Sequence, residues 1–266
     1  MKTIRFGMLE GSIGDAITLL PVANNSDFTL EATSYHSRIQ IFQHNCKVEI
    51  TDKLTLEQES IEKYGAGVQR EPYLHAALNF LKVFGVETED PLPSMNLLQE
   101  ELEFGEDWIK SRFSEEKQVL VFSPTIAGLK ENFDDCRRFR FLPTQYWEWM
   151  IEKLSARFEM VYTCQESDFI PLKGNYIRLH LPVRQTAAVL RAAGLFLGVD
   201  SGIHHLSVAN GVQTFVLVPT RRFGPGYCFT NYCYEDPSFW KKRERTASYA
   251  TFGQFVELTN HICAHF

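Results

Sequence analysis

The chain has 266 residues, 44% of them hydrophobic, which is enough for one large core or two smaller lobes. Its 27 basic and 33 acidic residues give a formal charge of −6, which offers no global attraction for a phosphate backbone and argues against general nucleic-acid binding. Six cysteines are scattered without a C-x-x-C pair, which favours reduced thiols in a cytoplasmic protein. No signal-peptide core follows the N-terminus, and no run approaches the ~20 apolar residues of a membrane span.

The first part of the chain is predicted to alternate strands with helices. Strand-like runs cover 3–9, 27–33 and 38–50, where β-branched and aromatic residues are bounded by polar turns. After the first of them, the glycine turn EGSIGD leads into a helix from Ala16. A further helix is predicted over 71–85, ending at Gly85.

The acidic segment 86–96 carries Pro91 and Pro93 and is typical of a linker. We therefore expect a reduced N-terminal domain over 1–92 and a second domain over 93–266. The terminal helix, 251–266, belongs to the second domain by position, and a return to the first lobe is the alternative.

The second part of the chain has a regular βα rhythm. Strands are predicted at 118–124, 159–164, 175–181, 195–199 and 214–218. Helices are predicted at 143–158, 184–194, 203–210 and 251–266. Short strands separated by helices imply βαβ units, so the fold class is α/β with parallel sheets.

The stretch FLGVDSGIHHL places polar residues where a predicted strand ends and a helix begins. Ser201 and Gly202 can cap the helix and let a ligand approach the backbone, so the turn suits a phosphate. Asp200, His204 and His205 exceed what capping requires, although for the two histidines the alternative is that one packs in the core and one is solvated.

A second glycine turn in the first lobe has the same strand, loop and helix order. It contains Gly11, Ser12 and Gly14 and ends at Asp15, which opens the helix in this interpretation. The turn is not G-x-G-x-x-G, so a dinucleotide fingerprint is not supported. Asp15 is either a helix cap or a functional carboxylate.

Three blocks of the sequence, in chain order, resemble the family 9 glycosyltransferases, the ADP-heptose heptosyltransferases of lipopolysaccharide synthesis and their relatives. They are EGSIGDAITLLP, FLPTQYWEWM and the long block from Thr186 to Thr220 that contains VDSGIHHL. The helix YLHAALNFLKVFGV is also similar. The resemblance implies a GT-B fold, in which two Rossmann-like lobes face a cleft, and an inverting transfer of a sugar from a nucleotide-diphosphate donor, with ADP favoured.

The resemblance also implies roles for individual residues. Asp15, in its turn of Gly11, Ser12 and Gly14, matches the family's proposed general base. The residues that match the donor-binding part of the family are Asp200, Ser201, Gly202, His205, Pro219 and Thr220, with His204 beside them. Val218 departs from the family, which has glycine before that proline.

A basic residue of the family meets the donor three positions before the proline of the middle block. That position is Arg140 here, where the family has lysine. Arginine keeps the charge but offers phosphate oxygens a planar fork. If the alignment shifts within CRRFRFLP, Arg138 takes this position instead. The alternative is that these basic residues only form a solvated face, with no role in donor binding.

We expect no metal and no cofactor. Asp-x-Asp, the usual metal-diphosphate motif, does not occur in the chain. Cys228 and Cys233, with His261 and Cys263, form only a loose grouping that suits a metal poorly.

The acceptor is not identified, because the first lobe is shorter than in the family: 51–72 stands where a further βα stretch is usual. A catalytically weak nucleotide or nucleotide-sugar binding protein is therefore the alternative function. The aromatic and cationic segment 221–245 either stacks on a sugar or base, contacts a membrane face, or packs between the lobes.

Overall fold

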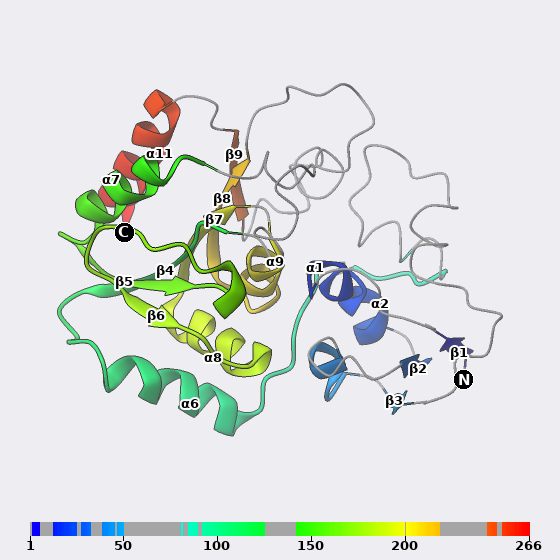
Figure 1. The fold of residues 1–266 in the computed structure, drawn as a ribbon. Coiled ribbons are helices and arrows are strands. Elements are labelled where there is room, and N and C mark those ends of the chain that lie inside the picture. The colour runs from blue at the N-terminus through cyan, green and yellow to red at the C-terminus, as the bar shows by residue number, and fades with distance from the viewer. Residues whose placement is uncertain are drawn as a thin grey trace. The chain divides into compact units, whose positions relative to one another are not determined.

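The computed structural model describes most of the second half of the chain and separate pieces of the first. The described residues are 2–5, 13–25, 28–32, 39–45, 47–50, 81, 85–89, 92–125, 142–199, 201–218, 244–248 and 252–266. The chain divides into two compact units (Figure 1). The first comprises Met1–Leu98 with Gly226–Lys242, and the second Gln99–Pro225 with Arg243–Phe266.

The first unit contains a parallel sheet, as its sequence predicts. Among the described residues, strands β1 (Lys2–Arg5), β2 (Phe28–Ala32) and β3 (Lys47–Ile50) lie in the order β1-β2-β3. Helices α1 (Ile13–Ile17) and α2 (Leu20–Asn25) connect β1 to β2. Both helices bury apolar side chains because residues three or four apart share one helical face.

Two sequence expectations in this unit were wrong in detail. The run 38–50 is not one strand, since Gln40–Phe42 form a 3-10 turn, η1, and only Lys47–Ile50 are β3. The buried Ile41 and Phe42 are consecutive, and His44 has a φ of 70°, so the alternation of a strand is lost. In addition, α1 begins at Ile13, which makes Asp15 its third residue instead of its cap.

The predicted helix end at Gly85 is confirmed. Gly85 has a φ of 63°, and the N–H of Val86 donates to the carbonyl of Leu81 over 2.9 Å. This is the bond that a glycine C-cap makes, and an L side chain at Gly85 is strained at that φ.

The second unit is built on a six-stranded parallel sheet in its described part. The strands are β4 (Gln118–Ser123), β5 (Phe158–Thr163), β6 (Ile177–Leu179), β7 (Leu195–Val199), β8 (Gln213–Val218) and β9 (Glu244–Ser248). Their order in the sheet is β6-β5-β4-β7-β8-β9. All neighbouring pairs are parallel, which confirms the predicted α/β class.

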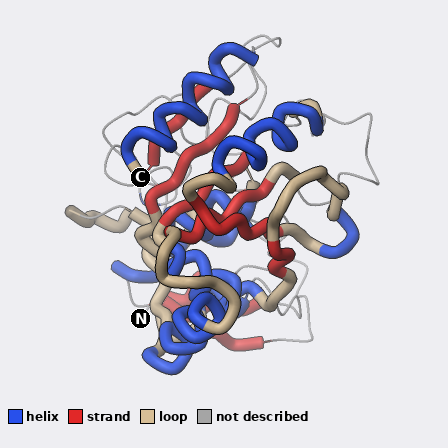
Figure 2. Tube along the Cα trace, turned by 90° about the vertical axis from the view of Figure 1, so that its left-hand side faces the viewer, coloured by secondary structure: helices blue, strands red, loops and turns tan. Residues whose placement is uncertain are grey.

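Helices cover both faces of this sheet (Figure 1 and Figure 2). Helices α7 (Thr144–Leu154) and α11 (Phe252–His265) pack on one face, where Trp147 and Phe255 are fully buried. Helices α8 (Val183–Ala193) and α9 (Gly202–Ala209) contact the strands from the other face. Strand residues alternate between the two layers, and both sides are apolar because both are covered.

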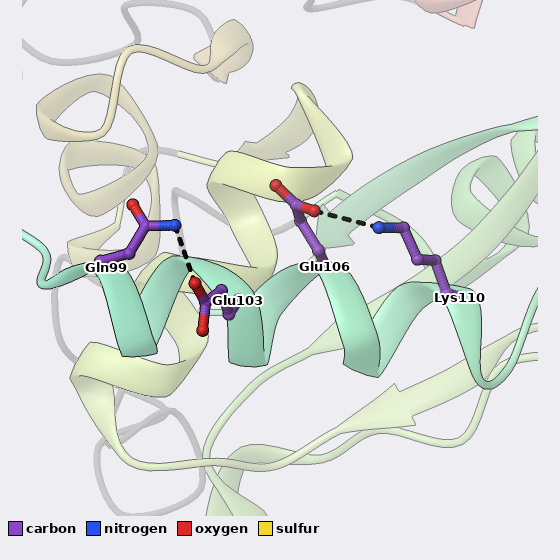
Figure 3. A network of polar contacts seen from close by, with 4 residues as sticks. All are labelled: Gln99, Glu103, Glu106 and Lys110. Carbon is purple, nitrogen blue, oxygen red and sulfur yellow. Dashed lines mark hydrogen bonds and ion pairs between the residues drawn. The ribbon is translucent and has the colours of Figure 1, made fainter.

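Helix α6 (Gln99–Lys110) and strand β9 were not predicted from the sequence. Helix α6 packs along α8 and exposes its other face, where Gln99 bonds to Glu103 and Glu106 pairs with Lys110, each over 3.0 Å (Figure 3). Strand β9 pairs with β8 from Thr214↔Glu244 to Val218↔Ser248. Both elements are poor in apolar residues, so their sequence signal is weak.

No helix in the described part of the chain combines the length and the apolar character that crossing a membrane requires.

Candidate functional site at the carboxyl edge of the second sheet

The order of strands in the second sheet creates a topological switch point. From β4 the chain proceeds to β5 and β6 on one side, and then returns to place β7 on the other side of β4. The connections after β4 and β7 therefore leave the sheet in opposite directions. In open parallel sheets, ligands bind in the crevice that this divergence creates at the carboxyl ends of the strands.

Two connections with polar residues border the switch point. The end of β4 continues as Ser123, Pro124 and Thr125, and the two hydroxyl residues are buried. The end of β7 leads to Ser201 and α9, and the pairing Ser123↔Gly198 places the ends of β4 and β7 side by side. The sequence motifs pointed to Ser201 but not to the end of β4, whose signal was the Ser-Pro-Thr sequence at the end of a buried strand.

Ser201 caps the helix that starts at this edge. Its φ and ψ of −156° and 170° are extended, and its hydroxyl accepts a hydrogen bond from the His204 N–H over 3.4 Å. The first N–H groups of a helix have no partner within it and carry the positive end of the helix dipole. Gly202, the first residue of α9, is partly exposed, so this helix start suits an anion.

His204 and His205 are brought together in the first turn of α9. Both are buried, and their ring centroids are 4.3 Å apart. The helix is held beneath them, because the Ser207 hydroxyl donates to the His204 carbonyl over 2.7 Å and lies 2.8 Å from the Thr214 hydroxyl of β8. Both imidazoles are therefore buried in the turn of helix that follows Ser201. The sequence had left open whether one of them is solvated.

The end of β5, on the far side of β4, carries the buried hydroxyl of Tyr162 and the partly buried thiol of Cys164. Burial raises the pKa of the Tyr162 hydroxyl above its usual range and the pKa of the Cys164 thiol to about 11. Neither group supplies a nucleophile at neutral pH. The Cζ atom of Arg178 lies 3.6 Å from the centroid of the Phe169 ring, and its Nη2 atom lies 2.6 Å from the Glu166 Oε2 atom. The Glu166 carboxylate therefore compensates the charge of Arg178 at the surface.

Only some of the predicted site residues lie in the described part of the chain. In the first unit, Gly14 is buried in α1 and Asp15 follows it in the helix. The predicted site residues that lie outside the described residues are Gly11, Ser12, Arg138, Arg140, Asp200, Pro219 and Thr220. The described part of 221–245 is the start of β9, and its remainder also lies outside.

The described residues bring no three His, Cys, Asp or Glu side chains together as ligands for a metal ion. Cys164 and Cys263 are free thiols, and Cys228 and Cys233 lie outside the described residues.

Two units with parallel sheets, the second doubly wound with a polar switch point, place the chain among the α/β proteins of Rossmann-like architecture. No family model and no curated protein sequence matches the chain.

Solved structures identify the fold more closely. A family 9 glycosyltransferase from Veillonella parvula has a TM-score of 0.64 at 12% identity, covering 98% of this chain and 89% of its own. The E. coli heptosyltransferase WaaC, solved with ADP-2-deoxy-2-fluoro heptose, has a TM-score of 0.58 at 12% identity, and all of both chains is covered. TibC from enterotoxigenic E. coli, an iron-containing dodecameric glycosyltransferase, has a TM-score of 0.59 at 15% identity, covering 98% of this chain and 76% of its own.

The chain thus has the GT-B fold of the family 9 glycosyltransferases, as its sequence motifs predict. Because the identities are low, this likeness concerns the fold.

Proposed function

We propose that the protein is a family 9 glycosyltransferase that transfers a sugar from a nucleotide-diphosphate sugar, with ADP as the favoured nucleotide, to an acceptor hydroxyl. The observation that carries the proposal is the capped start of α9 at the switch point, formed by Ser201 and Gly202. A structural neighbour solved with an ADP-heptose analogue supports the choice of donor and makes heptose the first sugar to test.

The diphosphate is proposed to bind over the turn from Asp200 to Gly202, with His204 and His205 beneath it and Pro219 and Thr220 after the next strand. The N–H groups of the helix start stabilise negative charge without proton transfer. Arg140, with Arg138 as its rival, adds a charge-assisted contact that strengthens as the diphosphate leaves.

Transfer at an anomeric carbon passes through an oxocarbenium-like state, and the acceptor hydroxyl loses its proton as it attacks. Asp15 is proposed to accept that proton, aided by the glycine turn of Gly11, Ser12 and Gly14. One direct displacement of this kind inverts the anomeric configuration. The sequence lacks Asp-x-Asp, so the helix start and the arginine are assigned the role that a metal has in other transferases.

The reaction is proposed to take place in the cytoplasm, where scattered cysteines stay reduced. The short stretch 51–72 favours an acceptor smaller than, or presented differently from, a lipopolysaccharide core. The same shortening supports the alternative function, a catalytically weak protein that binds nucleotides or nucleotide-sugars.

Binding and turnover separate these functions. Isothermal titration with ADP, UDP, GDP and CDP should show micromolar or tighter binding of ADP, and Gly202→Val should weaken it because a branched side chain obstructs the backbone N–H groups. Ile203→Val, one residue further along α9, is the matched control and should bind normally. Equal ADP affinity in folded Gly202→Val and wild type contradicts the proposed site.

Turnover is then measured as hydrolysis or transfer over a panel of nucleotide-sugars, with and without EDTA. Transfer with an inverted anomeric product, unaffected by EDTA, supports the proposed enzyme. Tight binding without turnover on any donor supports the alternative.

A further inference from the structure

Two buried hydroxyl groups meet in the contact between helix α9 and strand β8. Ser207 lies on α9 and Thr214 on β8, and both are completely buried. The Ser207 Oγ and Thr214 Oγ1 atoms are 2.8 Å apart, which is the distance of a hydroxyl–hydroxyl hydrogen bond. Burial of two polar groups is favourable only where both are hydrogen-bonded, so this pair joins the helix to the strand at a defined point.

The Ser207 hydroxyl also contacts the first turn of α9. It donates to the His204 carbonyl oxygen over 2.7 Å. The N–H of the same residue, His204, donates to the hydroxyl of the N-cap residue Ser201 over 3.4 Å. The backbone at residue 204 is therefore bonded to the cap on one side and, through Ser207, to strand β8 on the other.

Two hydroxyl protons are shared among three contacts in this cluster. The third contact is that of the Thr214 Oγ1 atom with the Val212 carbonyl oxygen, over 2.9 Å. A hydroxyl donates one proton, so Ser207 and Thr214 cannot donate to all three contacts at once. When Ser207 donates to His204 and Thr214 donates to Ser207, an unbroken chain of hydrogen bonds connects β8 to the start of α9.

We propose that Ser207 and Thr214 are positioning residues for the nucleotide-diphosphate site. They fix the first turn of α9 so that its free N–H groups point at the phosphate oxygens. This inference rests on the proposed function, because it requires the diphosphate to bind at the start of α9. Both side chains are completely buried, so they act through the backbone of His204 and not by touching the ligand. Such support matters because a hydrogen bond weakens steeply when its angle is distorted.

Substitutions of Thr214 separate positioning by the hydroxyl from simple packing. Valine has nearly the shape of threonine but lacks the hydroxyl, whereas serine keeps the hydroxyl and lacks the methyl group. If Thr214 only fills space, Thr214→Ser is the more harmful change. If its hydroxyl positions α9, Thr214→Val is the more harmful change for nucleotide binding.

Isothermal titration of the full chain with ADP, at a temperature where every variant is folded, tests the proposal. We expect Ser207→Ala and Thr214→Val each to raise the Kd for ADP by about three- to tenfold, the effect of one hydrogen bond. Thr214→Ser should bind ADP as wild type does, although the loss of a buried methyl group lowers its melting temperature. The double variant Ser207→Ala, Thr214→Val should lose less affinity than the product of the two single effects, because both changes break the same chain of hydrogen bonds.

Thr259→Val is the matched control. Thr259 lies on α11, against the opposite face of the sheet, and is 1% exposed. Its hydroxyl donates to the Phe255 carbonyl over 2.9 Å, so the substitution also removes a buried hydroxyl that is bonded to a backbone carbonyl. Thr259→Val should leave the affinity for ADP unchanged, whatever its effect on the melting temperature.

Equal affinity for ADP in wild type, Ser207→Ala and Thr214→Val overturns this inference and leaves the proposed function intact. Weaker binding by Thr214→Ser than by Thr214→Val also overturns it, because packing is then what residue 214 contributes. An equal loss of affinity in Thr259→Val does the same, since a general loss of stability then explains the effect. If wild type binds none of ADP, UDP, GDP and CDP, the proposed function fails and this inference fails with it.

Discussion

Arg184 and Glu101 form an ion pair that joins helix α8 to helix α6. The Arg184 Nε and Nη2 atoms lie 2.5 and 2.6 Å from the two carboxylate oxygens of Glu101. The side chains are only 7% and 19% exposed, so this pair compensates two charges that are largely removed from water.

Replacing Arg184 should therefore cost much more stability than replacing an exposed basic residue. We expect Arg184→Ala to lower the free energy of unfolding by about 2–4 kcal/mol, because it removes the two-pronged cationic partner of a largely buried carboxylate. Lys110→Ala removes the exposed pair with Glu106 on the same helix (Figure 3) and should leave the free energy of unfolding almost unchanged, because water screens this pair. Urea titrations measure both, and equal losses contradict the importance of burial.

Gly105 makes the contact between α6 and α8 close. A Cβ there would lie 2.5 Å from the Ala188 carbonyl carbon and 3.1 Å from the Ala188 Cβ. Gly105→Ala should thus destabilise the protein by about 1–3 kcal/mol, although the same change in an open helix stabilises by about 1 kcal/mol. Thermal melting shows whether Gly105→Ala lowers or raises the stability. A second substitution, Ala188→Gly, should not restore the stability of the variant, because the clash is with the backbone of residue 188.

Asp15 is the proposed general base, and the substitution Asp15→Asn tests this role. Since Asp15 lies in the first turn of α1, loss of its charge should cost only about 0.3–1 kcal/mol through the helix dipole. A base must accept a proton, so transfer should fall by at least about a hundredfold while ADP affinity stays near normal. Donor hydrolysis is the first assay, with water in place of the acceptor. Full transfer activity in Asp15→Asn would falsify the assignment.

Arg140 and Arg138 compete for the contact with the leaving diphosphate. Arg140→Ala should reduce turnover more than donor affinity, because the charge on the diphosphate grows in the transition state. Turnover and binding of both alanine variants are compared on the same donor. If Arg140→Ala has normal turnover and Arg138→Ala is inactive, Arg138 is the residue that contacts the leaving diphosphate.

Local patterns in the sequence were enough to predict many of the strands and helices. Buried parallel strands such as β4 and β7 are apolar runs that end at polar residues. This pattern identifies a buried strand whichever strands it pairs with. Gly85 was recognisable as a helix end because only glycine adopts its φ without strain. The turn at Ser201 was recognisable because capping is decided within four residues.

Features that depend on partners far along the chain could not be predicted from the sequence and became visible in the folded protein. Helix α6 has a glycine in its middle and few apolar residues, and it is stabilised by Arg184 and Ala188, far along the chain. Strand β9 forms because its backbone pairs with the backbone of β8. The proximity of the β4 and β7 ends follows from strand order, which is set by how helices pack on both faces of the sheet, and no local pattern encodes it.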